Sequence, residues 1–308
     1  MKYIRIYYYI IFIILLSSDL SAKITIKYKI GEEIITNSDI ENEKNYLTFL
    51  RPKLSNLSND EMLKISESSL IKEIIKKKEI NKAFKEVNNE KLINKIKESL
   101  FKYKNVSNEE ELLNILKNTN IKYEKIIEKM KYEALWNELI FQKYNSLIKI
   151  DKTKLKSELI TKISNNKKYE YNISEILFEI ENNEDLENKY NKILNYIKIN
   201  DFKDAASRFS ISNSGKRGGE IGWIKETLLS ENLSKLISKM NKYEITKPLK
   251  YPNGYLILRI NDKKEMKQVV SIDKELEELI IFEKNRQLNQ FSLLFFKKLQ
   301  QNTIINEY

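Results

Sequence analysis

The chain has 308 residues, 41% hydrophobic and 32% charged, a composition typical of a folded globular protein rather than a disordered one. It contains no cysteine and no histidine, which excludes disulfide bonds, thiolate or Ser-His catalysis and histidine-ligated metal. The formal net charge is +11, but 55 basic residues are interleaved with 44 acidic ones. A solvated mixed-charge surface is therefore expected, and no nucleic-acid partner.

The first 22 residues have the order of a secretory signal. A basic start, Met1–Arg5, is followed by the eleven-residue apolar run Ile6–Leu16 and by small residues up to Ala22. Eleven apolar residues are too few to cross a bilayer, which takes about 20. We therefore predict that residues 1–22 are a signal peptide and that the protein is exported. Membrane association is expected only if this segment stays uncleaved.

The N-terminal half is predicted to be mainly helical. Two short strands come first, over residues 23–30 and 33–36, where apolar and polar residues alternate. Ser38 and Ser58 are each followed three residues later by glutamate, the spacing of a capping box, and predict two helix starts. No glycine or proline interrupts residues 53–214, and apolar residues recur at helical spacing to about residue 165.

The pattern changes at Tyr169. The predicted elements there are a strand at 169–180, helices at 183–199 and 201–210, a strand at 220–224, a helix at 228–240, and two strands around a turn at 252–254. This order is that of an α+β module. From Asp262 the chain is predicted to be helical again. The apolar faces of this last segment predict that it docks on the N-terminal helices.

Four of the six glycines lie between Gly215 and Gly222, beside two basic residues. Neither the Walker A spacing G-x-x-x-x-G-K-[ST] nor the dinucleotide fingerprint G-x-G-x-x-G before a long helix is present. No nucleotide, cofactor or metal is therefore predicted. Gly218, Gly219 and Gly222 are explained instead by a loop that reverses and enters a strand with little room for side chains.

Two segments resemble the parvulin (PpiC-type) prolyl isomerase pattern. "DFKDAASRFSISNSGKRGGEIGW", Asp201–Trp223, has the alanine-rich short helix, the "FS" and the "GG-x-[LI]-G-W" of that family, and Lys242–Ile260 is similar to its closing strands. Three further segments resemble the SurA family of periplasmic chaperones: "KIGEEIITNSDI" at Lys29–Ile40, "EYNISEILFEI" at Glu170–Ile180 and "FSLLFFKKLQQNTIINEY" at Phe291–Tyr308.

The resemblance implies an α+β architecture of two parts. A mainly helical chaperone domain over residues 23–168 is completed by a C-terminal helix at 263–308, and one parvulin-like domain is inserted at 169–262. The implied function is that of a periplasmic chaperone for unfolded outer-membrane β-barrel proteins or other exported polypeptides. The alternative is an active peptidyl-prolyl cis-trans isomerase, a foldase of exported proteins. A third hypothesis is a scaffold protein anchored by an uncleaved N-terminus.

The positions that match the family's site are substituted. Active parvulins carry two histidines, and the matching positions here hold Glu175 in the first strand and Leu256 in the last. Ser212 lies closest to the family's acidic or cysteine residue. Because these changes alter the polar groups that would bind a twisted amide, we predict weak or no isomerase activity. The family's apolar proline pocket falls on three residues that are equally expected as ordinary core: Ile224, Leu229 and Leu233.

Overall fold

The computed structural model describes residues 24–84, 89–117, 119–164, 169–180, 184–252, 254–266 and 271–308. The predicted signal peptide and Asn253 of the predicted turn lie outside the described residues. In chain order the elements, with η for a 3-10 helix, are β1 (Ile26–Ile30), β2 (Glu33–Thr36), α2 (Asn37–Leu50), η1 (Pro52–Asn56), α3 (Asn59–Ala83), α4 (Glu90–Lys104), α5 (Glu109–Leu116), α6 (Tyr123–Tyr144), η2 (Asn145–Leu147), α7 (Lys152–Ser164), β3 (Tyr169–Phe178), α8 (Leu186–Ile199), α9 (Phe202–Phe209), η3 (Gly215–Arg217), β4 (Glu220–Lys225), η4 (Glu226–Leu228), α10 (Glu231–Ile237), β5 (Leu249–Tyr251), β6 (Gly254–Glu265), α11 (Ile272–Gln301) and β7 (Ile305–Glu307).

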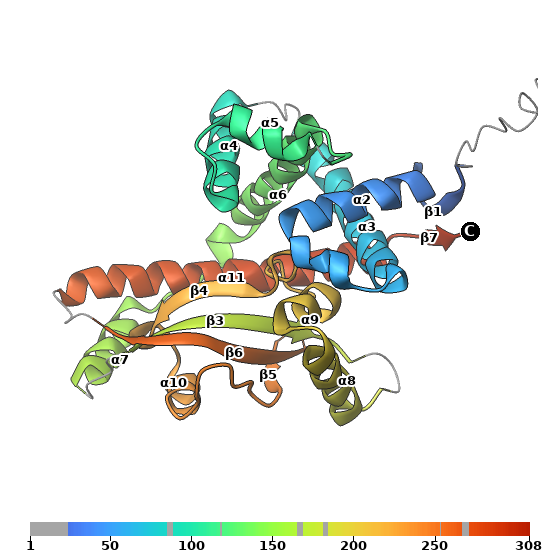
Figure 1. The fold of residues 1–308 in the computed structure, drawn as a ribbon. Helices are drawn as coiled ribbons and strands as arrows, with labels where there is room; N and C mark the ends of the chain where they lie inside the picture. The colour runs from blue at the N-terminus through green and yellow to red at the C-terminus, as the bar shows by residue number, and fades with distance from the viewer. Residues whose placement is uncertain are drawn as a thin grey trace, which may run out of the picture.

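Helices α2 to α6 form the upper layer of the molecule in Figure 1, and α3 packs against both α2 and α6. Ser58 caps α3 in a capping box with Glu61, as predicted. The predicted cap of α2 at Ser38 is wrong by two residues, because Thr36 forms the capping box with Asp39. None of the described helices combines the length and apolarity that a membrane crossing requires.

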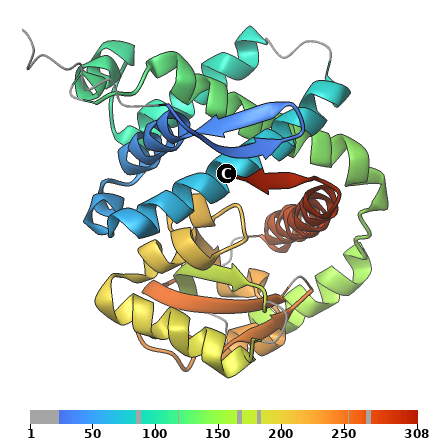
Figure 2. The same cartoon turned by 90° about the vertical axis from the view of Figure 1, so that its right-hand side faces the viewer.

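The two ends of the described chain meet in a small antiparallel sheet of order β2-β1-β7. Figure 2 shows β7, at the C-terminus, beside the N-terminal strands. The inner face of this sheet buries Ile30 and Ile35, which form a cluster with Ile40 and with apolar residues of α3. The C-terminal strand β7 is therefore paired with β1, the first strand of the described chain.

The second sheet has the order β4-β3-β6-β5, with every neighbouring pair antiparallel. Successive side chains of a strand point to opposite faces. On β3, Ile176 and Phe178 are buried against α8 and α9 on one face. On the other face, Tyr171 and Ile173 pack with residues of α10 and η4. We call this second face the α10 face. The sheet and its helices form the expected α+β module.

Helix α11 belongs to both parts of the molecule. In its first half, Phe282 packs against the cluster on the α10 face, and Glu275 accepts a hydrogen bond from Lys225 of β4 at 2.6 Å. In its second half, Phe295 stacks on Trp136 of α6 with ring centroids 5.6 Å apart. The predicted docking of the C-terminal helix on the N-terminal helices is confirmed.

The predicted start of this helix at Asp262 is wrong. Strand β6 continues to Glu265 because its last residues still pair with β3, where Glu265 lies opposite Tyr169. Helix α11 begins only at Ile272, after Ser271, whose side chain accepts a hydrogen bond from the backbone of the first turn.

Candidate functional site

The glycine-rich loop enters the sheet through backbone conformations that other residues rarely adopt. Gly219 has φ +73°, and a Cβ there would lie 2.1 Å from the carbonyl oxygen of Glu175. Gly218 has φ +73°, and its Cβ would lie 2.8 Å from the Cβ of Lys203. Gly222 has φ +96° at the irregular register between β4 and β3. Backbone geometry thus explains these glycines.

The loop brings two serines onto the carboxylate of Glu175. Ser212 Oγ and Ser214 Oγ each donate a hydrogen bond to Glu175 Oε1, both at 2.8 Å. Ser214 also donates its backbone N–H to Ser212 Oγ at 3.2 Å. The structure therefore joins two of the predicted site residues and adds Ser214, which the sequence analysis missed. The alternation of serines at 210, 212 and 214 was the available signal.

Leu256 lies on the same face of the sheet as Glu175. In the pairing of β3 with β6, Leu256 is opposite Leu177, and Glu175 is opposite Leu258. Directly opposite residues of an antiparallel pair project to the same face, and so do residues two apart on one strand. The position predicted to match the family's second histidine thus holds an aliphatic side chain, diagonal to Glu175 on the same face of the sheet.

The three predicted pocket residues lie in one apolar cluster with Leu256. Ile224 is 8% exposed and Leu229 is 3% exposed, so both are packed as core residues. Leu233, on α10, is half-buried. Of the three side chains, Leu233 therefore has the largest exposed fraction.

Tyr251 connects this site to α11. Burial raises the pKa of the Tyr251 hydroxyl, and the negative charge of Glu175 raises it further, whereas its contacts with Gln290 and Arg286 of α11 lower it. Arg286 itself forms a two-bond ion pair with Glu283, at 2.7 and 2.6 Å. The C-terminal helix therefore runs past the predicted site on the α10 face.

The helical domain holds the elements that frame the site. Arg51, at the end of α2, is buried and donates hydrogen bonds to Lys203 O and Asp204 Oδ1 of α9, both at 2.7 Å, and to Ser207 Oγ. Burial raises the pKa of Asp204 to about 6; Asp201 adds to this rise and Arg51 opposes it. A buried ion pair thus joins the two parts of the chain.

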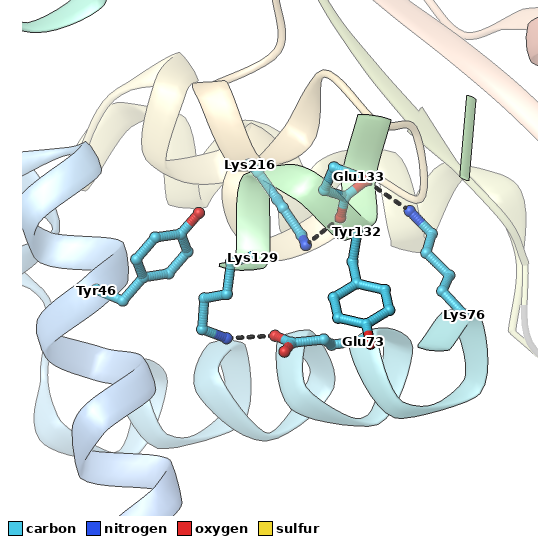
Figure 3. A pocket seen from close by; sticks show the side chains of 7 residues that line it. All are labelled: Tyr46, Glu73, Lys76, Lys129, Tyr132, Glu133 and Lys216. Carbon is cyan, nitrogen blue, oxygen red and sulfur yellow. Dashed lines mark hydrogen bonds and ion pairs between the residues drawn. The ribbon is translucent and has the colours of Figure 1, made fainter. Parts of the chain in front are cut away.

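A second ion-pair network joins the glycine-rich loop to α3 and α6 (Figure 3). Lys216 donates to Glu133 at 2.8 Å, and Lys76 donates to the other oxygen of this carboxylate at 2.9 Å. Burial raises the pKa of Glu133, but the two lysines outweigh it and hold that pKa well below its usual range. Lys216, beside the glycines of the loop, is therefore paired with Glu133 of the same chain. The network surrounds a cavity of about 30 Å³ lined by Tyr46, Glu73, Lys76, Lys129, Tyr132, Glu133 and Lys216.

Comparison with known proteins identifies the sheet module. Residues 150–262 match the family model described as Rotamase, PPIC-type PPIASE domain. Over 64 residues the chain is 39% identical to the chaperone SurA of Pseudomonas putida, a match that covers 21% of this chain and 15% of that protein. This chain is SurA-like and carries a PpiC-type domain. The matched range begins at residue 150 and so includes α7, whereas the predicted domain began at Tyr169. The predicted domain bounds stay a prediction.

Two further comparisons of the SurA-like chain have lower sequence identity. Over 78 residues it is 33% identical to the foldase protein PrsA of Bacillus subtilis, covering 22% of this chain and 27% of that protein. A solved structure from work on PEB4 and Cj1289, two SurA-like chaperones of Campylobacter jejuni, aligns over 92% of this chain and 99% of its own at 16% identity, with a TM-score of 0.38. The matched segments span less than a third of the length of each of the two relatives compared by sequence, SurA of Pseudomonas putida and PrsA of Bacillus subtilis.

Proposed function

We propose that this protein is a periplasmic chaperone that binds unfolded exported polypeptides, outer-membrane β-barrel proteins among them. We also propose that its PpiC-type domain has weak or no isomerase activity. The similarity to proteins described as chaperone SurA supports the first part. The residues at the predicted catalytic positions, Glu175, Ser212 and Leu256, support the second part.

The hydrogen bonds of Glu175 are the observation that supports weak or no isomerase activity. Rotation about an X-Pro bond has a barrier of about 18–20 kcal/mol, and a catalyst lowers it by binding the twisted amide more tightly than the planar one. Hydrogen-bond donors aimed at the amide are the natural means. Here Ser212 and Ser214 donate to Glu175, and Leu256 has no polar group to offer. These two donors are therefore engaged by a carboxylate of the chain itself.

Exposed apolar side chains support the chaperone role. Ile26, Ile34 and Ile304 are exposed on and beside the small sheet formed by the two chain ends. A shallow groove of about 250 Å³ between α4, α5 and α6 is lined by Ile93, Tyr123 and Ile127 together with five charged residues, Lys97, Glu109, Glu124, Glu128 and Lys131. Exposed apolar side chains can contact an extended client, and many weak contacts along the client allow capture and release without a nucleotide.

The test is suppression of aggregation when an unfolded outer-membrane protein is diluted from denaturant into buffer with the purified chain. We expect protection at molar ratios near one, with no added nucleotide. If neither this client nor an unfolded soluble exported protein is protected, the chaperone proposal is wrong. Cell fractionation and N-terminal sequencing test export, for which soluble periplasmic protein beginning at Lys23 is expected.

The second candidate, an active foldase, is favoured by the hydroxyls of Ser212 and Ser214, since a client that displaced them from Glu175 would gain two donors. Proline-limited peptide isomerisation separates the two candidates. We expect relaxation times to stay in the uncatalysed range of tens of seconds or longer. Acceleration comparable to that of an active parvulin would establish the foldase and reject the non-catalytic domain.

A further inference from the structure

Glu175 is a single charge on an otherwise apolar stretch of the sheet. Between Ile173 and Leu177 on β3, and between Leu256 and Ile260 on β6, the residues of the α10 face are aliphatic except for Glu175. Glu175 is itself half-buried. A carboxylate among aliphatic side chains is poorly solvated, so its interaction with a nearby cation is stronger than in bulk water.

The charge of Glu175 is not matched by a cation of the described residues. Its two recorded side-chain partners, Ser212 and Ser214, are neutral hydroxyls, and both donate to Oε1. The cation beside Tyr251 is Arg286, and its guanidinium is engaged in the two-bond ion pair with Glu283. Two buried carboxylates of the described chain do have cations beside them: Glu43 pairs with Lys129 at 2.6 Å, and Asp204 pairs with Arg51.

We propose that Glu175 is a specificity-determining residue that selects clients with a lysine or arginine adjacent to an apolar residue. The apolar residue packs on half-buried Leu233 and Leu256, and the basic side chain pairs with the Glu175 carboxylate. The serines orient this carboxylate without neutralising it. The inference rests on the proposed binding of unfolded polypeptides and names the chemistry of the segment bound at the PpiC-type domain.

The expected preference is modest. Exposed and half-exposed ion pairs contribute about 0.2–1 kcal/mol, so a lysine should tighten binding by a factor of about 1.4 to 5 over a glutamine of similar length. Ionic strength screens charges that water can reach, and the Debye length is about 10 Å at 0.1 M salt and about 3 Å at 1 M. The preference should therefore shrink as salt is added, while the apolar part of the affinity should not.

The experiment compares two end-blocked peptides of ten residues that alternate aromatic and small residues and differ only in one central lysine or glutamine. Each carries a neutral fluorophore, and binding to the full purified chain is followed by anisotropy at low salt and at 0.5 M NaCl. The variants are Glu175→Gln and, as a matched control, Glu187→Gln. Glu187 is exposed on α8, which lies against the opposite face of the sheet, and its substitution changes the net charge by the same amount.

At low salt the lysine peptide should bind the parent chain and Glu187→Gln more tightly than the glutamine peptide does, by a factor of about 1.4 to 5. Glu175→Gln should bind both peptides equally. Equal binding of the two peptides by the parent chain overturns the inference, as does a lysine preference that survives in Glu175→Gln. If the chain still suppresses client aggregation in either case, the proposed chaperone function stands. If it binds neither peptide and protects no client, the proposed function fails as well.

Discussion

Replacing Arg51 by methionine should uncouple the helical domain from the PpiC-type domain. The substitution keeps an apolar chain of similar length but removes the hydrogen-bonded ion pair with Asp204 and two further hydrogen bonds to α9. Both charged side chains are less than 10% exposed, at 7% and 8%, so Asp204 would be left buried without its cation. Losing one partner of a buried pair costs about 3–5 kcal/mol, and we expect the free energy of unfolding to fall by that amount at pH 7.5.

The effect of Arg51→Met should depend on pH. Because the pKa of Asp204 is raised to about 6 in the folded chain, the folded state binds more protons than the unfolded state between about pH 4 and 6. Asp204 therefore destabilises the fold above pH 6, and this cost diminishes as the pH falls through 6. Removing Arg51 raises that pKa further, so the loss of stability should be clearly smaller at pH 5 than at pH 7.5.

Urea denaturation followed by tryptophan fluorescence can test this in both parts of the chain. Trp136 is buried in α6 of the helical domain, and Trp223 is 44% exposed on β4 of the PpiC-type domain. Single-tryptophan backgrounds assign each transition. The matched control is Arg217→Met, because Arg217 is exposed and should change stability by less than about 0.5 kcal/mol. If Arg51→Met costs no more than Arg217→Met, or costs the same at both pH values, the reasoning about the buried pair is wrong.

The other predictions concern single contacts and are measured as thermal or urea stability. Gly219→Ala should lower the free energy of unfolding by more than 2 kcal/mol, because its Cβ would lie 2.1 Å from Glu175 O. Gly222→Ala, whose Cβ would have nothing within 4 Å, should lower it only by the roughly 1–2 kcal/mol of its positive φ. Equal losses for the two variants would contradict this reasoning. Phe295→Ala should cost about 3–5 kcal/mol, and Leu294→Ala, 51% exposed, should cost far less. Lys216→Met should cost about 1–3 kcal/mol by removing one of the two cations of Glu133, and a change below 0.5 kcal/mol would refute that role. Because those lysines depress the pKa of Glu133, its contribution should be present above about pH 4.5 and be lost as the pH falls lower, which a pH series of Lys216→Met and the parent chain can show.

The local elements were predictable because they depend on neighbours in the sequence. A capping box such as Ser58 with Glu61 satisfies backbone groups within one turn, and the alternation along β3 assigns its two faces. The cap of α2 lies two residues before the predicted Ser38, because Thr36 and Asp39 satisfy each other's backbone N–H groups there.

Pairings between distant side chains were not predictable. Nothing near Arg51 indicates that it contacts Asp204, 153 residues later, and nothing near Lys216 indicates Glu133. Ser214 joined Ser212 at Glu175 only because the loop returns to β3 at Gly219, whose carbonyl accepts the Glu175 N–H at 2.8 Å. A long lysine or arginine side chain can reach many acceptors, and only the packed fold selects one.

The sequence by itself determined most of the helices and strands, the backbone role of the glycines and the complete absence of histidine, because these follow from residue type and spacing along the chain. The tertiary structure alone decided which charges of the described residues are paired, which half of α11 contacts which domain, and that Glu175 meets two serine hydroxyls. Those outcomes depend on burial and on contacts between segments far apart in the sequence, which a local pattern does not encode.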